Sequence, residues 1–428
     1  TFTDLAIGGA TGPRTLRFTA GSVGVTSSSI AVTAPGDPSA GEWASPVSMP
    51  IIAVHMNLLP DGKVLMWGKG GDPQLFDPAS GAFTSILSPA LLFCAGHAFL
   101  PDGRLLISGG HISNGHGLPA TTIYDWRTRS FQAGAPMSHG RWYPSVTTLP
   151  NGEMVTVSGR DENSLVVDIP EVWTGAAWRE LGSASQSLPY YPRMFVAPNG
   201  ELFAAGPPQE SRWLSTAADG RWTDAGISSS RYRDYGSAVM YEPGKIIYIG
   251  GGGVDSNSVP TATAEVINLN QGSPAWRLVA SMRYARRHLN ATLLPTGDIR
   301  VTRGTSASGF NNLSGGVHAA ELWNPVTEKW TTLASDQVTR AYHSTSLLLP
   351  DGRVLHSGSG DGAGAPQEQS YELFSPPYLF KGARPAIASA PATVSYGQQF
   401  SVGTPDGADI AKVTLIRLGS VTHAFDAN

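Results

Sequence analysis

The side chains best suited to redox or metal chemistry in this chain share one position of a repeated pattern. Seven turn glycines recur along the sequence: Gly62, Gly103, Gly152, Gly200, Gly244, Gly297 and Gly352. The residues nine positions before them are Ala53, Cys94, Tyr143, Tyr191, Tyr235, His288 and His343. A purely structural position would carry Val, Ile or Ala in most repeats. This one carries a thiol, phenol or imidazole group in six of the seven repeats, which indicates a chemical role.

The mixture of donor groups restricts the chemistry. Imidazole with phenolate oxygen suits a tetragonal Cu(II) or a ferric ion, both strong enough Lewis acids to deprotonate tyrosine. A hydrolytic zinc site would favour His with Asp or Glu and a general base, and no HExxH spacing occurs. Cys94 is the only cysteine, so it can form neither an internal disulfide nor a Cys-rich cluster. A thiol beside a phenol at an oxidising metal can couple to it covalently, and Cys94 and Tyr143 come from neighbouring repeats.

The glycines belong to a sevenfold repeat of predicted hairpins. The segment LLPDGKVLMWG, which starts at Leu58, recurs as FLPDGRLLISG, TLPNGEMVTVSG, VAPNGELFAAG, MYEPGKIIYIG, LLPTGDIRVTRG and LLPDGRVLHSG. Each copy has an apolar strand, a tight turn in which Gly accepts positive φ, and a second alternating strand. A second pair of apolar segments follows each hairpin, from QLFDPASGAFTSI after the first to YELFSPPYLF after the last.

Four short strands per repeat, with turn glycines 41 to 55 residues apart, are typical of kelch-like propeller blades. The sequence therefore predicts an all-β fold whose centre is a seven-bladed kelch-like β-propeller over residues 46–380. A β-sandwich would not explain seven turns in phase. Since the inner strand of every blade runs along the propeller axis, equivalent positions form rings around the central channel. We expect the ring of Cys94, Tyr143 and His343 at the mouth opposite the hairpin turns.

Two flanking segments lie outside the repeat. Residues 1–36 alternate apolar and polar side chains like the last strands of an immunoglobulin-type sandwich, and residues 37–45 resemble a linker. After the propeller, ATVSYGQQFSV and AKVTLIRLGSVTHAF resemble strands of another Ig-like or Greek-key β-domain, over residues 381–428. We expect both flanks to be partial domains.

Composition narrows the function classes. The chain has 428 residues with 50 Gly and 32 Pro, which argues against a helical bundle or coiled coil. The net charge of −4 offers no basic field for nucleic acid. No apolar run reaches the ~18–20 residues that a membrane helix needs. Abundant Ser, Thr, Gly and Trp with few lysines favours a secreted or cell-surface location.

Four motifs together resemble one known family. FCAGHAFLPDGRLLISGG, GRWYPSVTTLPNG, RAYHSTSLLLPDGRVLHSGSG and LGSVTHAFDAN are similar to segments of the galactose oxidase and glyoxal oxidase family of copper radical oxidases. The resemblance covers the propeller and the segment that follows it. It implies a mononuclear Cu(2+) held by Tyr143, Tyr342, His343 and His423, and a thioether that joins Cys94 to the ortho carbon of Tyr143.

The resemblance also implies a role for each residue. The sulfur substituent on Tyr143 would make a tyrosyl radical accessible, and copper would supply the second redox equivalent without an organic cofactor. Tyr342 would be the axial ligand and the general base for the substrate hydroxyl. His343 and His423 would be equatorial ligands. The activity implied is oxidation of a small aldehyde or primary alcohol, of the glyoxal, glycolaldehyde or carbohydrate type, with O2 as acceptor and H2O2 as product.

Further residues are candidates for the surroundings of the site. Tyr191, Tyr235 and His288 share the ring and are expected to line the pocket or fill the channel. Arg193 falls near the sequence position at which galactose oxidase has a substrate-contacting arginine. Where galactose oxidase has a tryptophan that shields the radical, this chain has Arg160 and Asp161 in SGRDENS, so Trp213 is the candidate replacement, or else an outer-strand packing residue. This departure makes galactose a doubtful substrate.

Two other functions compete with the oxidase. A catalytically silent kelch-type propeller could serve as an extracellular binding or matrix protein, but such a protein would be free to lose at least one of the five site residues, and all five are present. A sialidase-like hydrolytic propeller would need an arginine cluster and a nucleophilic Tyr–Glu pair, which the ring does not supply. The sequence does not name the substrate or the oligomeric state.

Overall fold

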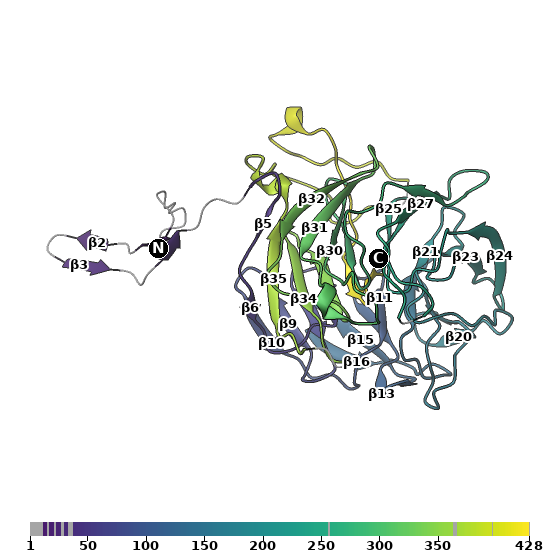
Figure 1. Ribbon diagram of the computed structural model, residues 1–428. Coiled ribbons are helices and arrows are strands. Elements are labelled where there is room, and N and C mark those ends of the chain that lie inside the picture. Colours follow the sequence, from purple (N-terminus) through teal and green to yellow (C-terminus); the bar gives the residue numbers. More distant parts are fainter. Residues whose placement is uncertain are drawn as a thin grey trace.

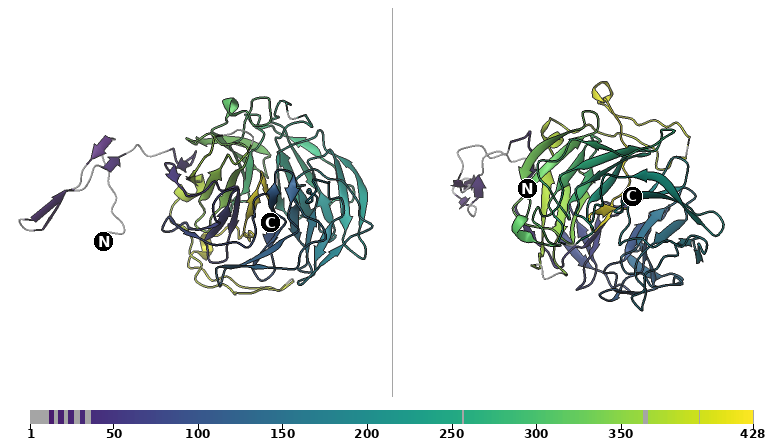
Figure 2. Two further views of the ribbon diagram at one scale, coloured as in Figure 1. Left: turned by 90° about the horizontal axis from the view of Figure 1, so that it is seen from below. Right: turned by 45° about the vertical axis from the view of Figure 1, so that its right-hand side comes forward.

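The predicted seven-bladed β-propeller is confirmed. A computed structural model describes residues 37–255, 257–362, 366–395 and 397–427, together with the backbone of four short strands before residue 33. Seven sheets surround a central axis (Figure 1), and the end of the chain lies inside the ring of blades (Figure 2). No helix among the described residues is long and apolar enough to cross a membrane.

Each blade has four antiparallel strands, ordered from the axis outwards. The innermost strands are β7 (His55–Leu58), β11 (Gly96–Phe99), β17 (Ser145–Thr148), β21 (Met194–Val196), β25 (Ser237–Glu242), β29 (Asn290–Leu293) and β33 (Ser344–Leu348). The second strands are β8 (Val64–Trp67), β12 (Leu105–Ser108), β18 (Met154–Val157), β22 (Leu202–Ala204), β26 (Lys245–Ile249), β30 (Ile299–Thr302) and β34 (Val354–Gly358). The third strands are β9 (Gln74–Asp77), β15 (Thr121–Asp125), β19 (Glu171–Trp173), β23 (Glu210–Ser215), β27 (Ala264–Asn268), β31 (Ala319–Asn324) and β35 (Ser370–Ser375). The outer strands are β10 (Ala82–Ser85), β16 (Ser130–Ala133), β20 (Trp178–Glu180), β24 (Arg221–Ser228), β28 (Arg277–Val279), β32 (Lys329–Ser335) and, in the last blade, β5 (Glu42–Trp43).

The last blade differs from the prediction because its outer strand comes from the other end of the propeller. β5 pairs with β35, and β6 (Val47–Ser48) pairs with the same strand. β5 lies within residues 37–45, where the sequence predicts a linker. The expected fourth strand, SPPYLF, instead forms the short 3₁₀ helix η2 (Pro377–Phe380). Two consecutive prolines lack the N–H groups that a ladder needs, so the strand ends there and the early segment closes the ring.

The ring residues share an unusual backbone conformation. Six of the seven have positive φ: Cys94 (62°), Tyr143 (69°), Tyr191 (45°), Tyr235 (48°), His288 (60°) and His343 (68°). Such a conformation costs of the order of 1–3 kcal/mol in a non-glycine residue and persists only where its surroundings hold it. Backbone hydrogen bonds between neighbouring blades do so, from Tyr143 N–H to the Cys94 carbonyl at 2.8 Å and from Tyr191 N–H to the Tyr143 carbonyl at 3.0 Å.

A buried ion pair anchors the segment just before the ring in four blades. The pairs are Arg141 with Glu171 (2.9 Å), Arg233 with Glu265 (2.5 Å), Arg286 with Glu321 (2.5 Å) and Arg340 with Glu372 (3.5 Å). The arginine precedes the ring residue by two or three positions, and the glutamate lies on the third strand. In the first pair, Arg141 also donates to the Ser158 carbonyl, and Glu171 accepts from the Ser138 N–H. Each pair therefore ties the ring residue to the body of its blade.

The segment after the propeller returns to the central channel. β36 (Ser420–Thr422) pairs with β7, and β37 (Phe425–Asp426) completes a hairpin with β36. β36 also lies against β11 and β33, and β37 lies against β25 and β29. The expected strands in ATVSYGQQFSV and in the first half of AKVTLIRLGSVTHAF do not form in the described residues, where only the 3₁₀ helix η3 (Gly407–Asp409) and one isolated bridge occur. A segment with alternating apolar and polar side chains forms a strand only where a neighbouring strand can pair with its backbone N–H and C=O groups.

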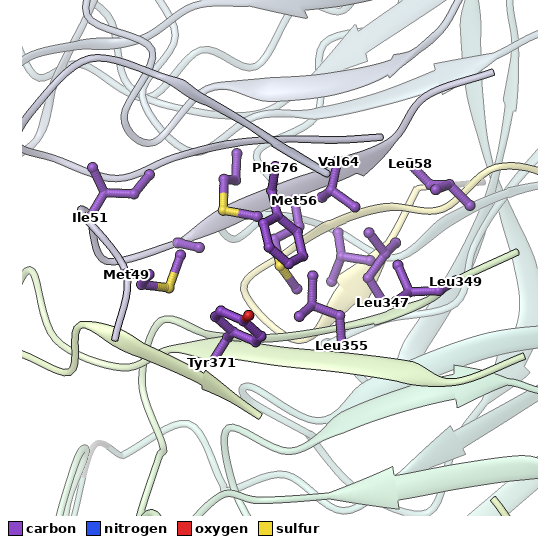
Figure 3. Close-up of a cluster of buried hydrophobic side chains, with 13 residues drawn as sticks. Met49, Ile51, Met56, Leu58, Val64, Phe76, Leu347, Leu349, Leu355 and Tyr371 are labelled. Atoms are coloured by element: carbon purple, nitrogen blue, oxygen red, sulfur yellow. The ribbon is translucent and has the colours of Figure 1, made fainter. Parts of the chain in front are cut away.

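Hydrophobic side chains fill the space between adjacent blades. The cluster between the last and first blades includes Met56, Leu347, Leu355 and Tyr371, together with Val421 of the returning hairpin (Figure 3). The hairpin is therefore part of a blade-to-blade core. The remaining short elements are β13 (His111–Ser113), β14 (His116–Gly117) and η1 (Leu313–Gly315). Before the propeller, β1 (Gly12–Arg14) pairs with β4 (Ile30–Val32), and β2 (Arg17–Ala20) pairs with β3 (Val23–Thr26).

The buried pairs predict a large cost for neutralising one partner. Glu171→Gln should lower the free energy of unfolding by about 3–5 kcal/mol, because it leaves the Arg141 charge buried and uncompensated. Glu242→Gln, which breaks the exposed pair with Lys245, is the matched control and should cost about 1 kcal/mol or less. Denaturant unfolding of the two variants compares the costs. Equal costs would contradict an anchoring role for the buried pairs.

Candidate functional site

Three predicted ligands lie in direct contact at the mouth of the channel. The Tyr143 and Tyr342 hydroxyl oxygens are 2.5 Å apart, and the Tyr143 hydroxyl lies 3.1 Å from His343 Nε2. Tyr143 precedes β17, and Tyr342 and His343 precede β33, so the starts of two inner strands supply these groups. All three side chains are buried. Blades that are distant in sequence thus bring two phenols and an imidazole to one point.

Hydrogen bonds fix the tautomers of both candidate histidine ligands. His343 Nδ1 lies 2.6 Å from the Gly360 carbonyl, which can only accept, so Nδ1 carries the proton and Nε2 has a free lone pair. Thr422 Oγ1 donates to the Val54 carbonyl at 3.0 Å and therefore accepts from His423 Nδ1 at 2.6 Å. His423 Nε2 also keeps its lone pair. This orientation by a second partner is typical of metal-binding histidines.

His423 reaches the same point from the returning hairpin. It lies in the turn between β36 and β37, with φ of 46°, and its ring centroid is 4.5 Å from that of Tyr143 and 4.6 Å from that of His343. His423 Nε2 is buried and has no hydrogen-bond partner. A buried acceptor without a partner is costly unless something binds it. The two phenol oxygens and two imidazole nitrogens therefore form a donor set that fits a transition-metal ion.

The tyrosines are essential to that donor set. Among the described residues, no group of three or more His, Cys, Asp or Glu side chains could hold a metal ion. Phenol and imidazole donors without carboxylates or thiolates favour Cu(II) or Fe(III) over zinc, calcium or magnesium.

Cys94 lies beside Tyr143, as the phasing of the blades predicts. Both belong to one buried cluster with Phe93 and Tyr191, and the Tyr143 N–H donates to the Cys94 carbonyl. Burial raises the pKa of the Cys94 thiol well above its usual value, and a hydrogen bond to the Tyr143 side chain opposes that rise. The thiol is therefore neutral at physiological pH, and it lies in the same buried cluster as the phenol ring.

Burial keeps every group of the site in its neutral form. It raises the pKa of Tyr143 well above its usual value, and the neighbouring Cys94 and Tyr342 add to the effect. It lowers the pKa of His343 to about 3 and that of His423 well below the usual value, so both imidazoles stay unprotonated at physiological pH. Deprotonation of either phenol therefore needs a positive charge at the site, which a bound metal ion would supply.

Trp142, and not Trp213, covers the phenol ring. The Trp142 and Tyr143 rings stack with centroids 3.9 Å apart and an interplanar angle of 14°. Trp142 Nε1 donates to His111 Nδ1 at 3.1 Å, which fixes the indole. Trp213 lies on the third strand β23 and packs against Phe203, away from the site. The tryptophan that stacks on Tyr143 is therefore its neighbour Trp142, and Trp213 is a packing residue, the alternative that the sequence left open.

Arg160 and Asp161 do not take the place of a shield. Arg160 Nε donates to the Tyr190 hydroxyl at 2.5 Å, and the Asp161 carboxylate accepts the N–H groups of Asn163 and Leu165, each at 2.8 Å. Asp161 therefore stabilises its own loop. Arg160 instead orients Tyr190, whose ring meets Tyr143 edge-on at 5.2 Å.

A pocket of about 280 Å³ opens beside the candidate ligands. Its wall includes the ring residues Tyr191 and Tyr235, together with Arg160, Tyr190, Arg193, Tyr232 and Asp234. Tyr191 stacks on His423 at 4.4 Å, and Tyr235 meets Tyr342 edge-on at 5.5 Å. His288 lies behind this wall, where its Nε2 bonds to the Phe310 carbonyl at 2.5 Å. Two rings of the pocket wall therefore contact the candidate ligands His423 and Tyr342 directly.

Arg193 holds the returning hairpin, although it also lies in the pocket wall. Its guanidinium donates to the carbonyls of Tyr191 (2.8 Å), Gly236 (2.9 Å) and His423 (3.1 Å), and it stacks over Phe425 at 5.1 Å. Since the side chain is buried and these carbonyls use its donors, its geometry is that of a positioning residue.

Four residues near the site were not predicted from the sequence: Trp142, His55, His97 and Thr422. Trp142 stood next to a predicted ligand, and its adjacency was the available signal. His55 and His97 lie on the inner strands β7 and β11, near the ring. Thr422 could be identified only from its contact with His423, because a threonine next to a histidine is common.

The contacts of Arg193 predict that its loss loosens the hairpin. Arg193→Met should raise hydrogen exchange in residues 419–427 by about tenfold or more, because the hairpin loses the donor to the His423 carbonyl and the guanidinium over Phe425. Arg221→Met, at an exposed outer-strand position, is the control. Unchanged exchange in the hairpin would contradict the positioning role.

Comparison with known proteins supports the resemblance to the galactose oxidase and glyoxal oxidase family. Two family models match the chain: "Glyoxal oxidase N-terminus" over residues 255–378, and "Galactose oxidase-like, Early set domain" over residues 384–428. The second range contains the returning hairpin with His423.

Curated relatives and a solved structure extend the match to most of the chain. Galactose oxidase of Gibberella zeae is 28% identical over 92% of this chain, which spans 64% of that relative's length. Aldehyde oxidase GLOX of Vitis pseudoreticulata is 29% identical over 78% of this chain and 70% of its own. A fungal alcohol oxidase of the AA5 family, solved in complex with copper, shares the fold with a TM-score of 0.80 at 23% identity, covering 91% of this chain and 88% of that one. The predicted resemblance to the galactose oxidase and glyoxal oxidase family is confirmed.

Proposed function

We propose that the chain is a copper radical oxidase that oxidises a small aldehyde or primary alcohol with O2 and releases H2O2. One observation carries the proposal: Tyr143, Tyr342 and His343 meet the unpartnered Nε2 of His423 beside a buried cysteine. The copper found in the AA5 alcohol oxidase and the activities named for the two curated relatives support it.

Four side chains would hold the metal: Tyr143, Tyr342, His343 and His423. Copper bound there would supply one-electron redox capacity, and its charge would stabilise phenolate forms of the tyrosines. The two imidazoles already present their Nε2 lone pairs, so the protein holds them ready without a change of tautomer. This preorganisation suits a site that takes up its metal after folding.

The second redox group would be a thioether between Cys94 and Tyr143. Its formation replaces the thiol S–H and one ring C–H by a C–S bond, and the two protons and two electrons pass to O2 to give H2O2. The sulfur substituent would spread the unpaired electron of a Tyr143 radical and lower the potential at which it forms. The stacked Trp142 would shield that radical from solvent.

The remaining steps follow from the positions of the two phenols. Tyr342 would accept the proton of the substrate hydroxyl, since it has the Tyr143 oxygen on one side and the pocket-wall residue Tyr235 on the other. The Tyr143 radical would abstract a hydrogen atom from the substrate carbon. An alcohol then yields an aldehyde, or an aldehyde hydrate an acid, and O2 takes up two electrons and two protons.

The pocket favours a small hydroxylated substrate. Its volume is about 280 Å³, and its wall combines tyrosine rings with the polar groups of Arg160, Tyr232 and Asp234. We propose a glyoxal, glycolaldehyde or small-alcohol substrate and a secreted protein. The alternative of a silent binding propeller is less favoured, because a binding surface does not require the two fixed histidine tautomers or a cysteine held against a tyrosine.

The proposal predicts a covalent change on copper loading. After exposure to Cu(II) and air, the intact mass should fall by two hydrogen atoms, and Cys94 should no longer react with thiol reagents in denaturant. Cys94→Ser and Tyr143→Phe should prevent this change and abolish peroxide release from a panel of aldehydes and alcohols. If Cys94 of the wild-type protein stays fully alkylatable, the radical mechanism is contradicted. If copper binds but no substrate of the panel yields peroxide, the binding propeller is favoured.

The stacked indole predicts a different phenotype. Trp142→Leu should leave copper binding and the mass change intact, while the oxidised radical form decays about tenfold faster or more, because solvent reaches the Tyr143 ring. Trp213→Leu is the matched control and should leave the decay unchanged. The optical and EPR signals of the radical report the rates. Faster decay in the Trp213 variant alone would restore the prediction made from the sequence.

A further inference from the structure

A chain of buried polar side chains runs from the backbone of Cys94 to the returning hairpin. Cys94 N–H donates to His55 Nε2 at 3.1 Å, and His55 Nδ1 lies 3.0 Å from His97 Nε2. His97 Nδ1 lies 2.6 Å from Ser420 Oγ, which donates to Asn57 Oδ1 at 2.7 Å. None of these residues except Cys94 belongs to the proposed redox or ligand set.

The positions of the protons allow only one donor-to-acceptor direction along this series of hydrogen bonds. A backbone N–H can only donate, so His55 Nε2 accepts and His55 Nδ1 carries the proton. His97 Nε2 must then accept, and His97 Nδ1 donates to Ser420. Every donor meets an acceptor only in this arrangement, so protonation of either ring would place two N–H groups against each other.

Both rings are held neutral and fixed. Burial lowers the pKa of His55 well below its usual value and that of His97 to about 3. The His55 ring stacks on Trp67 with centroids 4.9 Å apart and an interplanar angle of 12°, and Trp67 Nε1 donates to the Leu92 carbonyl at 2.9 Å. His55 therefore has little freedom to change its partners.

His55 also lies between Cys94 and the hairpin that carries His423. Its backbone pairs with Thr422, the residue that orients His423, while its ring bonds to the peptide of Cys94. The His55 ring meets the His423 ring edge-on at 5.8 Å. One residue thus contacts the cysteine strand and the hairpin that carries the last candidate ligand.

The hairpin needs such a contact because its ladder is short. β36 pairs with β7 over three residues only, and a slip by one residue would turn every side chain of β36 to the opposite face. Ser420 marks the register, since its hydroxyl bonds at once to His97 and to Asn57. An apolar pair in place of the histidines would pack but would not distinguish one register from the next.

We propose that His55 and His97 are positioning residues that set the register of the returning hairpin against Cys94, so that His423 and the cysteine face Tyr143 together. This inference rests on the proposed function. It implies that this hydrogen-bonded relay, from Cys94 N–H through His55 and His97 to Ser420, controls how fast the Cys94–Tyr143 bond forms. In that reaction the S–H and one ring C–H are lost, a C–S bond forms, and O2 accepts two electrons and two protons.

The test compares variants of the complete chain. His55→Phe keeps a ring on Trp67 but removes both hydrogen bonds, and His97→Leu removes the next link. Ser420→Ala deletes only one hydroxyl, so it still tests the proposal if either histidine variant fails to fold. His97→Gln keeps one acceptor and one donor as the conservative rescue, and His139→Leu, at an exposed position, is the control.

Two readouts separate positioning from general stability. In the metal-free protein, hydrogen exchange of residues 419–427 should rise by about tenfold or more in the Phe, Leu and Ala variants. On addition of Cu(II) and air, the rate of thioether formation, followed by intact mass and by Cys94 alkylation, should fall by about tenfold or more. His97→Gln should stay within about threefold of wild type in both measurements.

The possible failures have different meanings. A wild-type rate of thioether formation in folded His55→Phe and Ser420→Ala would overturn the positioning role, even if their melting temperatures fall. Unchanged hydrogen exchange in the hairpin would overturn it as well. A wild-type chain that forms no thioether would contradict the proposed function, while the exchange data would still decide whether the relay sets the hairpin.

Discussion

The candidate centre depends on a backbone constraint that recurs around the propeller axis. At the start of the inner strand, six blades place a non-glycine residue in the left-handed region, and hydrogen bonds between neighbouring blades hold several of these residues in place. The buried Arg–Glu pairs fix the preceding segment in four blades. Strain at one level is thus offset by the rigidity of the blades, and the channel mouth receives reactive side chains in defined positions.

The propeller alone does not complete the site. It supplies Tyr143, Tyr342 and His343, whereas His423 arrives on a two-stranded hairpin that joins the sheet of the first blade. Arg193 and Thr422 fix that hairpin and its histidine from within the channel. Since a single segment contributes both a candidate ligand and part of the blade-to-blade core, we expect folding of the hairpin and assembly of the candidate centre to be coupled.

The repeat made most of the fold and the ring predictable from the sequence. Seven phased turns place Cys94, Tyr143 and His343 at one level without any knowledge of their contacts. The outer strand β5 was missed because a two-residue strand carries no pattern and its partner β35 is about 330 residues away in sequence. His55 and His97 were missed because their contacts join different blades and the returning hairpin, which repeat periodicity does not describe. Trp142 was missed although it stands next to a predicted ligand.

Whether the two tyrosines and two histidines hold copper can be tested by anomalous diffraction at the copper absorption edge from crystals of the copper-loaded protein. We expect one strong peak within coordination distance of the Tyr143 and Tyr342 oxygens and of His343 Nε2 and His423 Nε2, with continuous density between Cys94 and the Tyr143 ring. Copper bound elsewhere, or no ordered copper at this point of the channel, would contradict it.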